Sequence, residues 1–257
     1  MTRIWTFSDL HVDSHAAYDP FGFGEHPDHD LILCAGDLCN GDFDVVPWLL
    51  EQFSDDERSR FAYVPGNHDY WRIGLGAGRE RLRRIAGETG ITVLDDAVAE
   101  IAGVRVVGTT LWSDLAMDPW IERDIGDFLH VAGFTPAEWR ARHAEAVRFL
   151  ESEVRPGDVV ATHFSPSFEG MSTDMQHNPR LTALSSAVMT PLEDLAHRLR
   201  PGLWVHGHTH VTREYSMGGT PVLTNAKGVG PGSLFEPGLV YDPGRPEALP
   251  DAGGLSP

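Results

Sequence analysis

Residues that can bind metals or transfer protons follow short apolar runs in this 257-residue sequence. Five apolar runs each have Asp, Asn or His within the next three positions, and they cover residues 4–7, 31–34, 61–64, 159–162 and 203–205. The candidate residues are Asp9, His11, Asp37, Asn67, His68, Asp69, His163, His208 and His210. Such a mixture of oxygen and nitrogen ligands suits zinc, manganese or iron better than calcium. The sequence therefore predicts a transition-metal site.

The apolar runs are predicted to be β-strands that lead to one common site. Near-continuous apolar strands are typical of a sheet that is covered on both faces. In open α/β sheets, ligands bind beyond the carboxyl ends of the strands. The five strand ends are therefore expected to converge, so that the polar residues after them lie side by side.

Helix signals lie between the strands. Thr135 and Thr190 are each followed by a proline and, three residues on, by a glutamate, which is a capping-box pattern with proline at the first helical position. Both are predicted to begin helices. Residues 91–110 are predicted to form two or three strands, and residues 213–225 a hairpin around a glycine pair. The sheets are therefore expected to be mixed and not purely parallel.

Two aspartates carry the argument for a pair of metal ions. Asp9 and His11 are two residues apart, and in an extended segment such residues point to the same side. Asp37 follows Gly36, which permits close backbone approach, and its two carboxylate oxygens can bridge two cations. Two cations about 3.5–4 Å apart can clamp a phosphate and lower the pKa of a shared water molecule. This chemistry is that of a hydrolase acting on phosphoryl groups.

The ordered motifs resemble those of the calcineurin-like metallophosphoesterases, in particular the bacterial type. The motifs are Asp9-x-His11, Gly36-Asp37, Gly66-Asn67-His68-Asp69, a lone His163 and Gly207-His208-x-His210. The resemblance implies an α/β fold, a four-layer α/β/β/α sandwich of two mixed sheets flanked by helices, over residues 1–241. Residues 242–257 are rich in Pro, Gly and Ala and are expected to form a loosely ordered tail.

The resemblance also implies a role for each motif residue. One metal ion would be held by Asp9, His11, Asp37 and His210. The other would be held by Asp37, Asn67, His163 and His208. The cofactors would be two divalent or mixed-valence transition metal ions, Mn, Fe or Zn, bridged by Asp37. The catalytic residues would be His68, which donates a proton or hydrogen bond to the leaving oxygen, and Asp69, which orients its imidazole. One departure is Asn40, where many relatives have glycine or a small acidic residue.

Some residues near the motifs have more than one interpretation. His206 is either a further ligand or a hydrogen-bonding partner of a ligand, because strand alternation points it to the same side as His208. Ser8 and Ser165 lie near histidines, but the Gly-x-Ser-x-Gly pattern of a serine nucleophile is missing, so we discount that mechanism.

Two further segments are expected to shape a substrate pocket, residues 110–128 and 164–190. Within them, Trp112 and Arg180 are candidate substrate contacts, together with Asn67 in the third motif. An ordinary solvated loop explains Arg180 equally well.

Composition limits the classes of protein. With 41% hydrophobic residues, the chain can form one sizeable globular domain or two small ones. A formal net charge of -18 argues against a broad grip on nucleic acid. No apolar run is long enough to span a bilayer, and Cys34 and Cys39 are expected to be core residues without a disulfide. We expect a cytoplasmic protein with no membrane partner, while its oligomeric state stays open.

Together, these features predict a dinuclear metal-dependent hydrolase of phosphate esters that uses a metal-bound water or hydroxide. The substrate is expected to be a phosphorylated small molecule or a phosphoprotein. A phosphomonoesterase and a phosphodiesterase both fit, although the compact chain favours an open cleft and a diester. Two alternatives stay open. A catalytically weak interaction scaffold on the same fold would be expected to lack ligands or His68, and a nuclease would be expected to show a basic groove.

Overall fold

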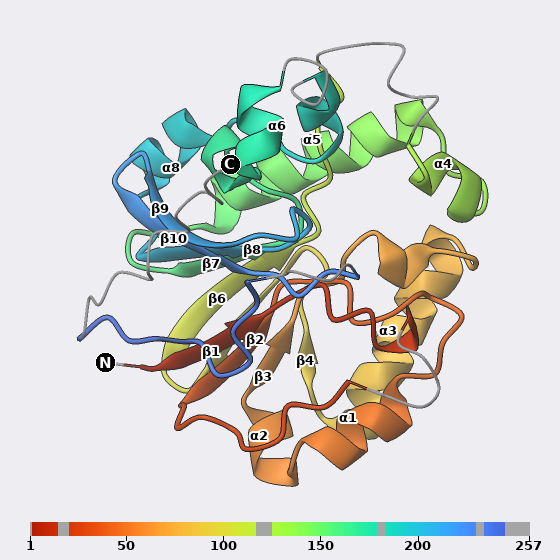
Figure 1. Ribbon diagram of the computed structural model, residues 1–257, viewed down its shortest axis with the longest axis vertical. Helices are drawn as coiled ribbons and strands as arrows, with labels where there is room; N and C mark the ends of the chain where they lie inside the picture. The colour runs from red at the N-terminus through yellow and green to blue at the C-terminus, as the bar shows by residue number, and fades with distance from the viewer. Residues whose placement is uncertain (1, 15–20, 117–124, 179–182, 230–233, 245–257) are drawn as a thin grey trace.

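The computed structural model describes residues 2–14, 21–116, 125–178, 183–229 and 234–244. Two β-sheets pack face to face, and helices cover the outer face of each sheet (Figure 1). The predicted four-layer α/β/β/α sandwich is therefore confirmed. Within the described ranges, no helix has both the length and the apolar character needed to cross a membrane.

The first sheet has the strand order β11-β1-β2-β3-β4. Its strands are β1 (Ile4–Phe7), β2 (Leu31–Cys34), β3 (Phe61–Tyr63), β4 (Thr92–Val93) and β11 (Val240–Tyr241). The pairs from β1 to β4 are parallel, whereas β11 is antiparallel to β1. The carboxyl ends of β1, β2 and β3 therefore lie at one edge, where the first three motifs begin.

The second sheet has the strand order β5-β6-β7-β8-β10-β9. Its strands are β5 (Ala97–Ile101), β6 (Val104–Thr109), β7 (Val159–Thr162), β8 (Leu203–His206), β9 (Thr212–Met217) and β10 (Thr220–Asn225). The four central strands are parallel, and both edge strands are antiparallel to their neighbours. The mixed sheets, the strands within 91–110 and the hairpin within 213–225 are thus confirmed.

Helices of very different length complete the outer layers (Figure 1). On the first sheet lie α1 (Val46–Gln52), α2 (Asp55–Ser59) and α3 (Leu75–Thr89). The helices associated with the second sheet are α4 (Asp127–His130), α5 (Pro136–Glu153), α6 (Thr173–His177) and α8 (Glu193–Leu199). Short 3-10 helices are η1 (Val12–Ser14), η2 (His68–Tyr70), η4 (Phe168–Gly170) and η5 (Ala183–Ala187).

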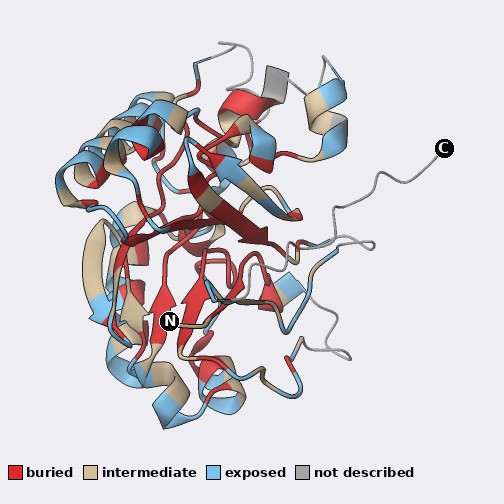
Figure 2. Ribbon diagram, turned by 90° about the vertical axis from the view of Figure 1, so that its left-hand side faces the viewer, coloured by how far each residue is buried: buried red, intermediate tan, exposed pale blue. Residues whose placement is uncertain are grey.

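Both faces of the central strands are buried, which explains their near-continuous apolar sequences. Successive side chains of a strand point to opposite faces. In β2, Leu31 and Leu33 belong to the core between the sheets, whereas Ile32 and Cys34 belong to the core that includes the helix-facing side chains. Figure 2 shows these buried residues in the strands and the exposed residues on the outer helix faces. Cys34 and Cys39 are free and buried, as predicted.

One of the two helix starts is confirmed and the other is wrong. Thr135 caps α5, its hydroxyl accepting a hydrogen bond from the backbone N–H of Glu138. At the second signal, α8 begins only at Glu193 and Leu192 is its N-cap residue. The hydroxyl of Thr190 instead accepts a hydrogen bond from the backbone N–H of Asp114, at 3.0 Å. The Thr190 hydroxyl therefore binds a distant backbone group and does not cap the helix.

Three predicted regions are described only in part. The expected pocket segments 110–128 and 164–190 contain residues 117–124 and 179–182, which lie outside the described residues. Arg180 is among these. Where the second segment is described, it forms η4, α6 and η5 and is not one long irregular loop. Of the predicted tail, residues 245–257 also lie outside the described part.

Candidate metal centre

The polar residues that follow the strands come together where the two sheets meet. Asp9 and His11 follow β1, and His208 and His210 follow β8 of the other sheet. The side chains form three groups, and within each group the potential ligand atoms lie within 4.8 Å of one another. The groups are Asp9, His11 and His210; His11, Asp37 and His68; and Asp37, His163 and His208. Five strand ends therefore converge on one site.

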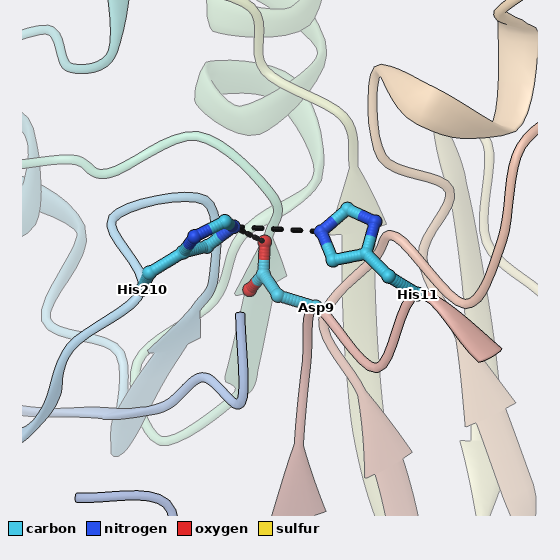
Figure 3. Close-up of side chains that lie close together, drawn as sticks. All are labelled: Asp9, His11 and His210. Atoms are coloured by element: carbon cyan, nitrogen blue, oxygen red, sulfur yellow. Dashed lines mark hydrogen bonds and ion pairs between the residues drawn. The ribbon is translucent and has the colours of Figure 1, made fainter. Parts of the chain in front are cut away.

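The first cluster consists of Asp9, His11 and His210 (Figure 3). His210 Nε2 lies 3.4 Å from Asp9 Oδ1 and 3.4 Å from His11 Nε2. The side chains of Asp9 and His11 are buried, whereas that of His210 is 40% exposed. The cluster is thus open to its surroundings only on the side of His210.

The second cluster consists of Asp37, Asn67, His163 and His208. His163 Nε2 lies 3.3 Å from Asp37 Oδ2, 2.9 Å from Asn67 Oδ1 and 3.1 Å from His208 Nδ1. The other nitrogen of His163, Nδ1, is 2.8 Å from the backbone oxygen of Ala35, which can accept its proton and fix the ring orientation. His163 is therefore held with Nε2 directed at the other three side chains.

Asp37 lies between the two clusters. Its Oδ2 is 3.9 Å from His11 Nε2 and 3.3 Å from His163 Nε2. Its Oδ1 accepts a hydrogen bond from the backbone N–H of His68, at 2.9 Å. Asp37 Oδ2 thus lies near ligand atoms of both clusters, which is the geometry expected of a bridging ligand.

The ligand residues leave the extended conformation as soon as their strands end. Positive φ angles occur at Asp9 (54°), His11 (43°), Asp37 (56°), His208 (67°) and His210 (53°). Non-glycine residues rarely adopt this region, and such strain concentrates at functional sites. Asp9 and His11 therefore lie close together, as predicted, but both have left the extended conformation, so strand alternation is not the cause.

Two glycines in the motifs are required by close packing. A Cβ atom on Gly36 would lie 2.2 Å from His163 Nδ1. A Cβ atom on Gly66 would lie 2.1 Å from Asp37 Oδ1. Any side chain at either position would therefore displace a candidate ligand.

The two sheets are joined at the site by the segment after β10. Ala226 forms an isolated parallel bridge with Ser8. The backbone N–H groups of Lys227 and Gly228 donate to the backbone oxygens of Ser8 and Asp9, at 3.0 and 2.9 Å. These contacts hold Asp9 beside the histidines that follow β8.

Electrostatically, histidines are the basic groups that face the buried carboxylates of Asp9 and Asp37. Among the described residues, no arginine or lysine lies within 4.0 Å of these carboxylates, whereas His11, His163 and His210 do. Burial alone would lower the pKa of His163, but the charges of Asp37 and Asp9 and the hydrogen bonds to Asp37 and to the Ala35 backbone outweigh it and raise the pKa to about 9. Burial lowers the pKa of His208 and of His11. The carboxylates thus attract positive charge to this point.

His68 is oriented by Asn40 and not, as predicted, by Asp69. His68 Nδ1 lies 3.0 Å from Asn40 Oδ1, and Asn40 Nδ2 donates to Asp13 Oδ2 at 2.6 Å. Because a carboxylate only accepts, Asp13 fixes the amide with its oxygen toward His68. His68 then carries its proton on Nδ1. Trp71 stacks on the His68 ring with 3.6 Å between centroids. Asn40 could have been found from its departure from the family pattern, whereas nothing in the sequence singled out Asp13.

Asp69 supports the backbone of the site. Its Oδ2 accepts hydrogen bonds from the backbone N–H groups of Asp37 (3.2 Å) and Gly66 (2.8 Å). Arg81 Nη1 lies 3.8 Å from Asp69 Oδ1. Burial and the charge of Asp37 raise the pKa of Asp69 to about 6. Asp69 therefore links the loops that carry Asp37 and Asn67, instead of contacting the His68 imidazole.

Two further candidates lie away from the cluster. His206 Nε2 is 3.0 Å from the hydroxyl of Tyr215, and Nδ1 is 2.9 Å from the backbone oxygen of Gly207. His206 belongs to none of the three groups of potential ligand atoms, and both of its nitrogens contact residues other than the candidate ligands, so the structure supports neither of its two predicted roles. Trp112 is 4% exposed and packs on the ring of Trp139, so it is a core residue instead of a substrate contact.

The fold and the paired clusters define the chain as a protein of the metallophosphoesterase class. The family model described as calcineurin-like phosphoesterase matches residues 2–212, and the chain belongs to this family of hydrolases. It is 22% identical over 253 residues to the uncharacterized protein L509 of Acanthamoeba polyphaga mimivirus, covering 86% of this chain and 89% of that protein.

A solved structure supports the same fold. The crystal structure of phosphopantetheinyl hydrolase (PptH) from Mycobacterium tuberculosis aligns with a TM-score of 0.67 and 19% sequence identity. The alignment covers 88% of this chain and 89% of that one. At this identity, the likeness establishes the shared fold.

Proposed function

We propose that this protein is a two-metal hydrolase of phosphate esters. One observation carries the proposal: the buried carboxylates of Asp9 and Asp37 contact histidines and, within the described part of the chain, no arginine or lysine. Buried carboxylates are costly unless positive charge lies beside them, and the neighbouring histidines supply it only by binding protons. Two metal cations would supply the positive charge in place of those protons, and the nitrogen and oxygen donors around them fit transition metals.

The donors divide into two sets that share Asp37. One ion would be held by Asp9, His11, Asp37 and His210, and the other by Asp37, Asn67, His163 and His208. When bound, such a pair of cations neutralises the phosphate and lowers the pKa of a water molecule, and manganese, iron and zinc all fit the donor types. Residues of the chain would donate the proton to the leaving oxygen and hold the metal ligands in place.

His68 is the proposed proton donor to the leaving oxygen. Because Asn40 binds Nδ1, Nε2 is the nitrogen that can face a substrate. In its protonated form, the His68 imidazolium carries a second proton on Nε2; passing that proton to the departing oxygen would avoid the release of an alkoxide and leave the neutral ring protonated on Nδ1. Asp69 acts through the backbone, keeping Asp37 and the Gly66 turn in place.

Metal analysis combined with two chromogenic substrates tests the proposal. Purified protein should hold about two metal ions per chain and hydrolyse a chromogenic monoester or diester with added Mn²⁺, and chelator should abolish turnover. We expect the diester to be preferred, because the compact chain favours an open cleft. A phosphopantetheinyl ester belongs in the panel because of the name of the M. tuberculosis relative.

Thermal denaturation gives a second, independent measurement. Ligand at one hundred times its Kd adds about 2.7 kcal/mol of stability. For a chain of this size, that corresponds to roughly 5–10 °C in Tm for each site. Chelator should lower the Tm by such an amount. Protein that binds no metal and shows no turnover under any supplement would contradict the proposal and favour an interaction scaffold.

A further inference from the structure

Asp127 is a buried acidic residue outside the predicted ligands that touches one of them. Its Oδ1 accepts a hydrogen bond of 2.8 Å from Asn67 Nδ2 and another of 2.8 Å from Trp71 Nε1. Asp127 is the first residue of α4, 60 positions away from Asn67 in the sequence, and is 6% exposed. A short helix that begins at the end of the expected pocket segment 110–128 therefore contacts a candidate ligand of the metal centre.

The contact with Asp127 determines which end of the Asn67 amide faces the second cluster. An amide donates at its nitrogen and accepts at its oxygen, whereas a carboxylate oxygen only accepts. Asn67 Nδ2 must therefore face Asp127, and Oδ1 is left 2.9 Å from His163 Nε2. In the reversed orientation, N–H groups would point at the cluster, where they could not bind a cation.

The same carboxylate oxygen also fixes Trp71. The Trp71 ring stacks on His68 on one side, and His130 of α4 stacks on Trp71 with 4.4 Å between centroids. The backbone N–H of Arg72 donates to the backbone oxygen of His130 at 2.6 Å. Three kinds of contact thus bind α4 to the turn that carries Asn67 and His68.

We propose that Asp127 is a positioning residue of the metal centre, which holds Asn67 with its carbonyl oxygen toward the second metal ion and holds Trp71 against His68. The inference rests on the proposed function, because it needs a metal ion at Asn67. Partners that orient ligands typically change metal affinity or activity by about 10–100-fold when they are removed. Asp127 should therefore control binding of one ion without being a ligand itself.

Equilibrium dialysis against limiting Zn²⁺ or Mn²⁺ tests the proposal with Asp127→Ala and Asp127→Asn. Asp127→Ala should bind one of its two ions about 10–100-fold more weakly than the wild type. Asp127→Asn should keep the wild-type affinity, because its amide oxygen can accept both hydrogen bonds. Should Asp127→Ala not fold, Asp127→Leu, which preserves the side-chain bulk, replaces it in the same measurement.

Two controls separate positioning from general damage. Asp158→Ala removes another buried aspartate, which pairs with Arg105 at the amino end of β7, and should leave metal binding unchanged. Trp71→Phe keeps an aromatic ring but removes the indole N–H together with the second ring, and should also keep both ions. A loss of metal in either control, equal losses in Asp127→Ala and Asp127→Asn, or no loss in Asp127→Ala would overturn the assignment. Wild-type protein without metal would instead refute the proposed function.

Discussion

Aspartates at the amino ends and at the carboxyl ends of the central strands differ in the basic side chains that lie beside them. At the amino ends, Arg3 before β1 pairs with Asp30 before β2, with Nη2 and Oδ1 3.1 Å apart, and Arg105 of β6 pairs with Asp158 before β7. At the carboxyl ends, the basic side chains that the described residues place within 4.0 Å of the Asp9 and Asp37 carboxylates are histidines. Arginines thus pair with Asp30 and Asp158 at the amino ends, whereas the described residues bring no arginine to Asp9 or Asp37 at the carboxyl ends.

This difference identifies the edge at which an external cation fits. An arginine next to a carboxylate gives a closed pair that has no further need of charge. A histidine offers a lone pair to a metal ion once it loses its proton, so the proton that Asp37 and Asp9 draw to His163 is one that a metal ion could replace. The predictions below test this difference between the two edges, starting with the largest expected effect.

Asp37→Ala should remove both metal ions and reduce turnover to background. Its Oδ2 is the oxygen shared by the two clusters, so neither set of donors is complete without it. Metal content by elemental analysis and turnover of a chromogenic ester measure the effect. Asp158→Ala at the opposite edge is the matched control, expected to keep its metal. An Asp37→Ala protein that stays active with two ions would show that the edges do not differ.

His68→Ala should keep both metal ions while turnover falls by about 10²–10⁴, the usual range for a positioned acid or base. His68 contacts Asp37 through its backbone N–H, which alanine retains. Metal content and turnover on an ester with a poor leaving group should be measured together. Unchanged turnover on that ester would exclude His68 from catalysis.

Asn40→Ala should reduce turnover by about 10–100-fold, less than the loss in His68→Ala, because the imidazole stays but its partner is gone. The single variant Asn40→Asp would place a second carboxylate against Asp13. Combining it with Asp13→Asn restores one donor and one acceptor, so the double variant should recover activity. Steady-state turnover at saturating metal measures both. A double variant as slow as Asn40→Ala would show that hydrogen bonding at Nδ1 is not the cause.

Asp30→Asn, at the amino ends, should have the smallest effect and no effect on metal binding. Hydrogen bonds from Arg3 lower the pKa of Asp30 to about 2, below the value of about 3.9 in an unfolded chain. Because the folded pKa is the lower one, the pair stabilises the protein above pH 4, and this contribution is lost as the pH falls toward 2. The Tm difference between wild type and variant should be constant from pH 7 to pH 5 and shrink below about pH 4. A difference that is independent of pH would contradict this.

The strands and the order of their motifs could be predicted from local sequence. Residues 31–34 are apolar at every position and residues 159–161 at every position before Thr162, and the strands found there are Leu31–Cys34 and Val159–Thr162. Apolar runs of this kind form buried parallel strands wherever the chain carries them, and turn residues end them. The Thr135 helix start is equally local, since the hydroxyl and the N–H that it accepts are three residues apart.

The partners of the motif residues depend on distant contacts instead. His68 is bound by Asn40, 28 residues away, and Asn67 by Asp127, 60 residues away. Thr190 loses its capping role to a contact with Asp114, 76 residues away. No local pattern ranks such contacts, because they depend on how complete sheets and helices pack.

The sequence by itself determined which residues could form the centre, since the residue types and their places after apolar strands are local properties. Only the tertiary structure decided that Asn40 and Asp127 orient the centre, that Asp69 acts through the backbone, and that His206 and Trp112 point elsewhere. Beyond a strand end, φ is free to change sign, as it does at Asp9 and His208. Side-chain direction is then set by the packing of the two sheets against each other, which a periodic pattern along one strand does not contain.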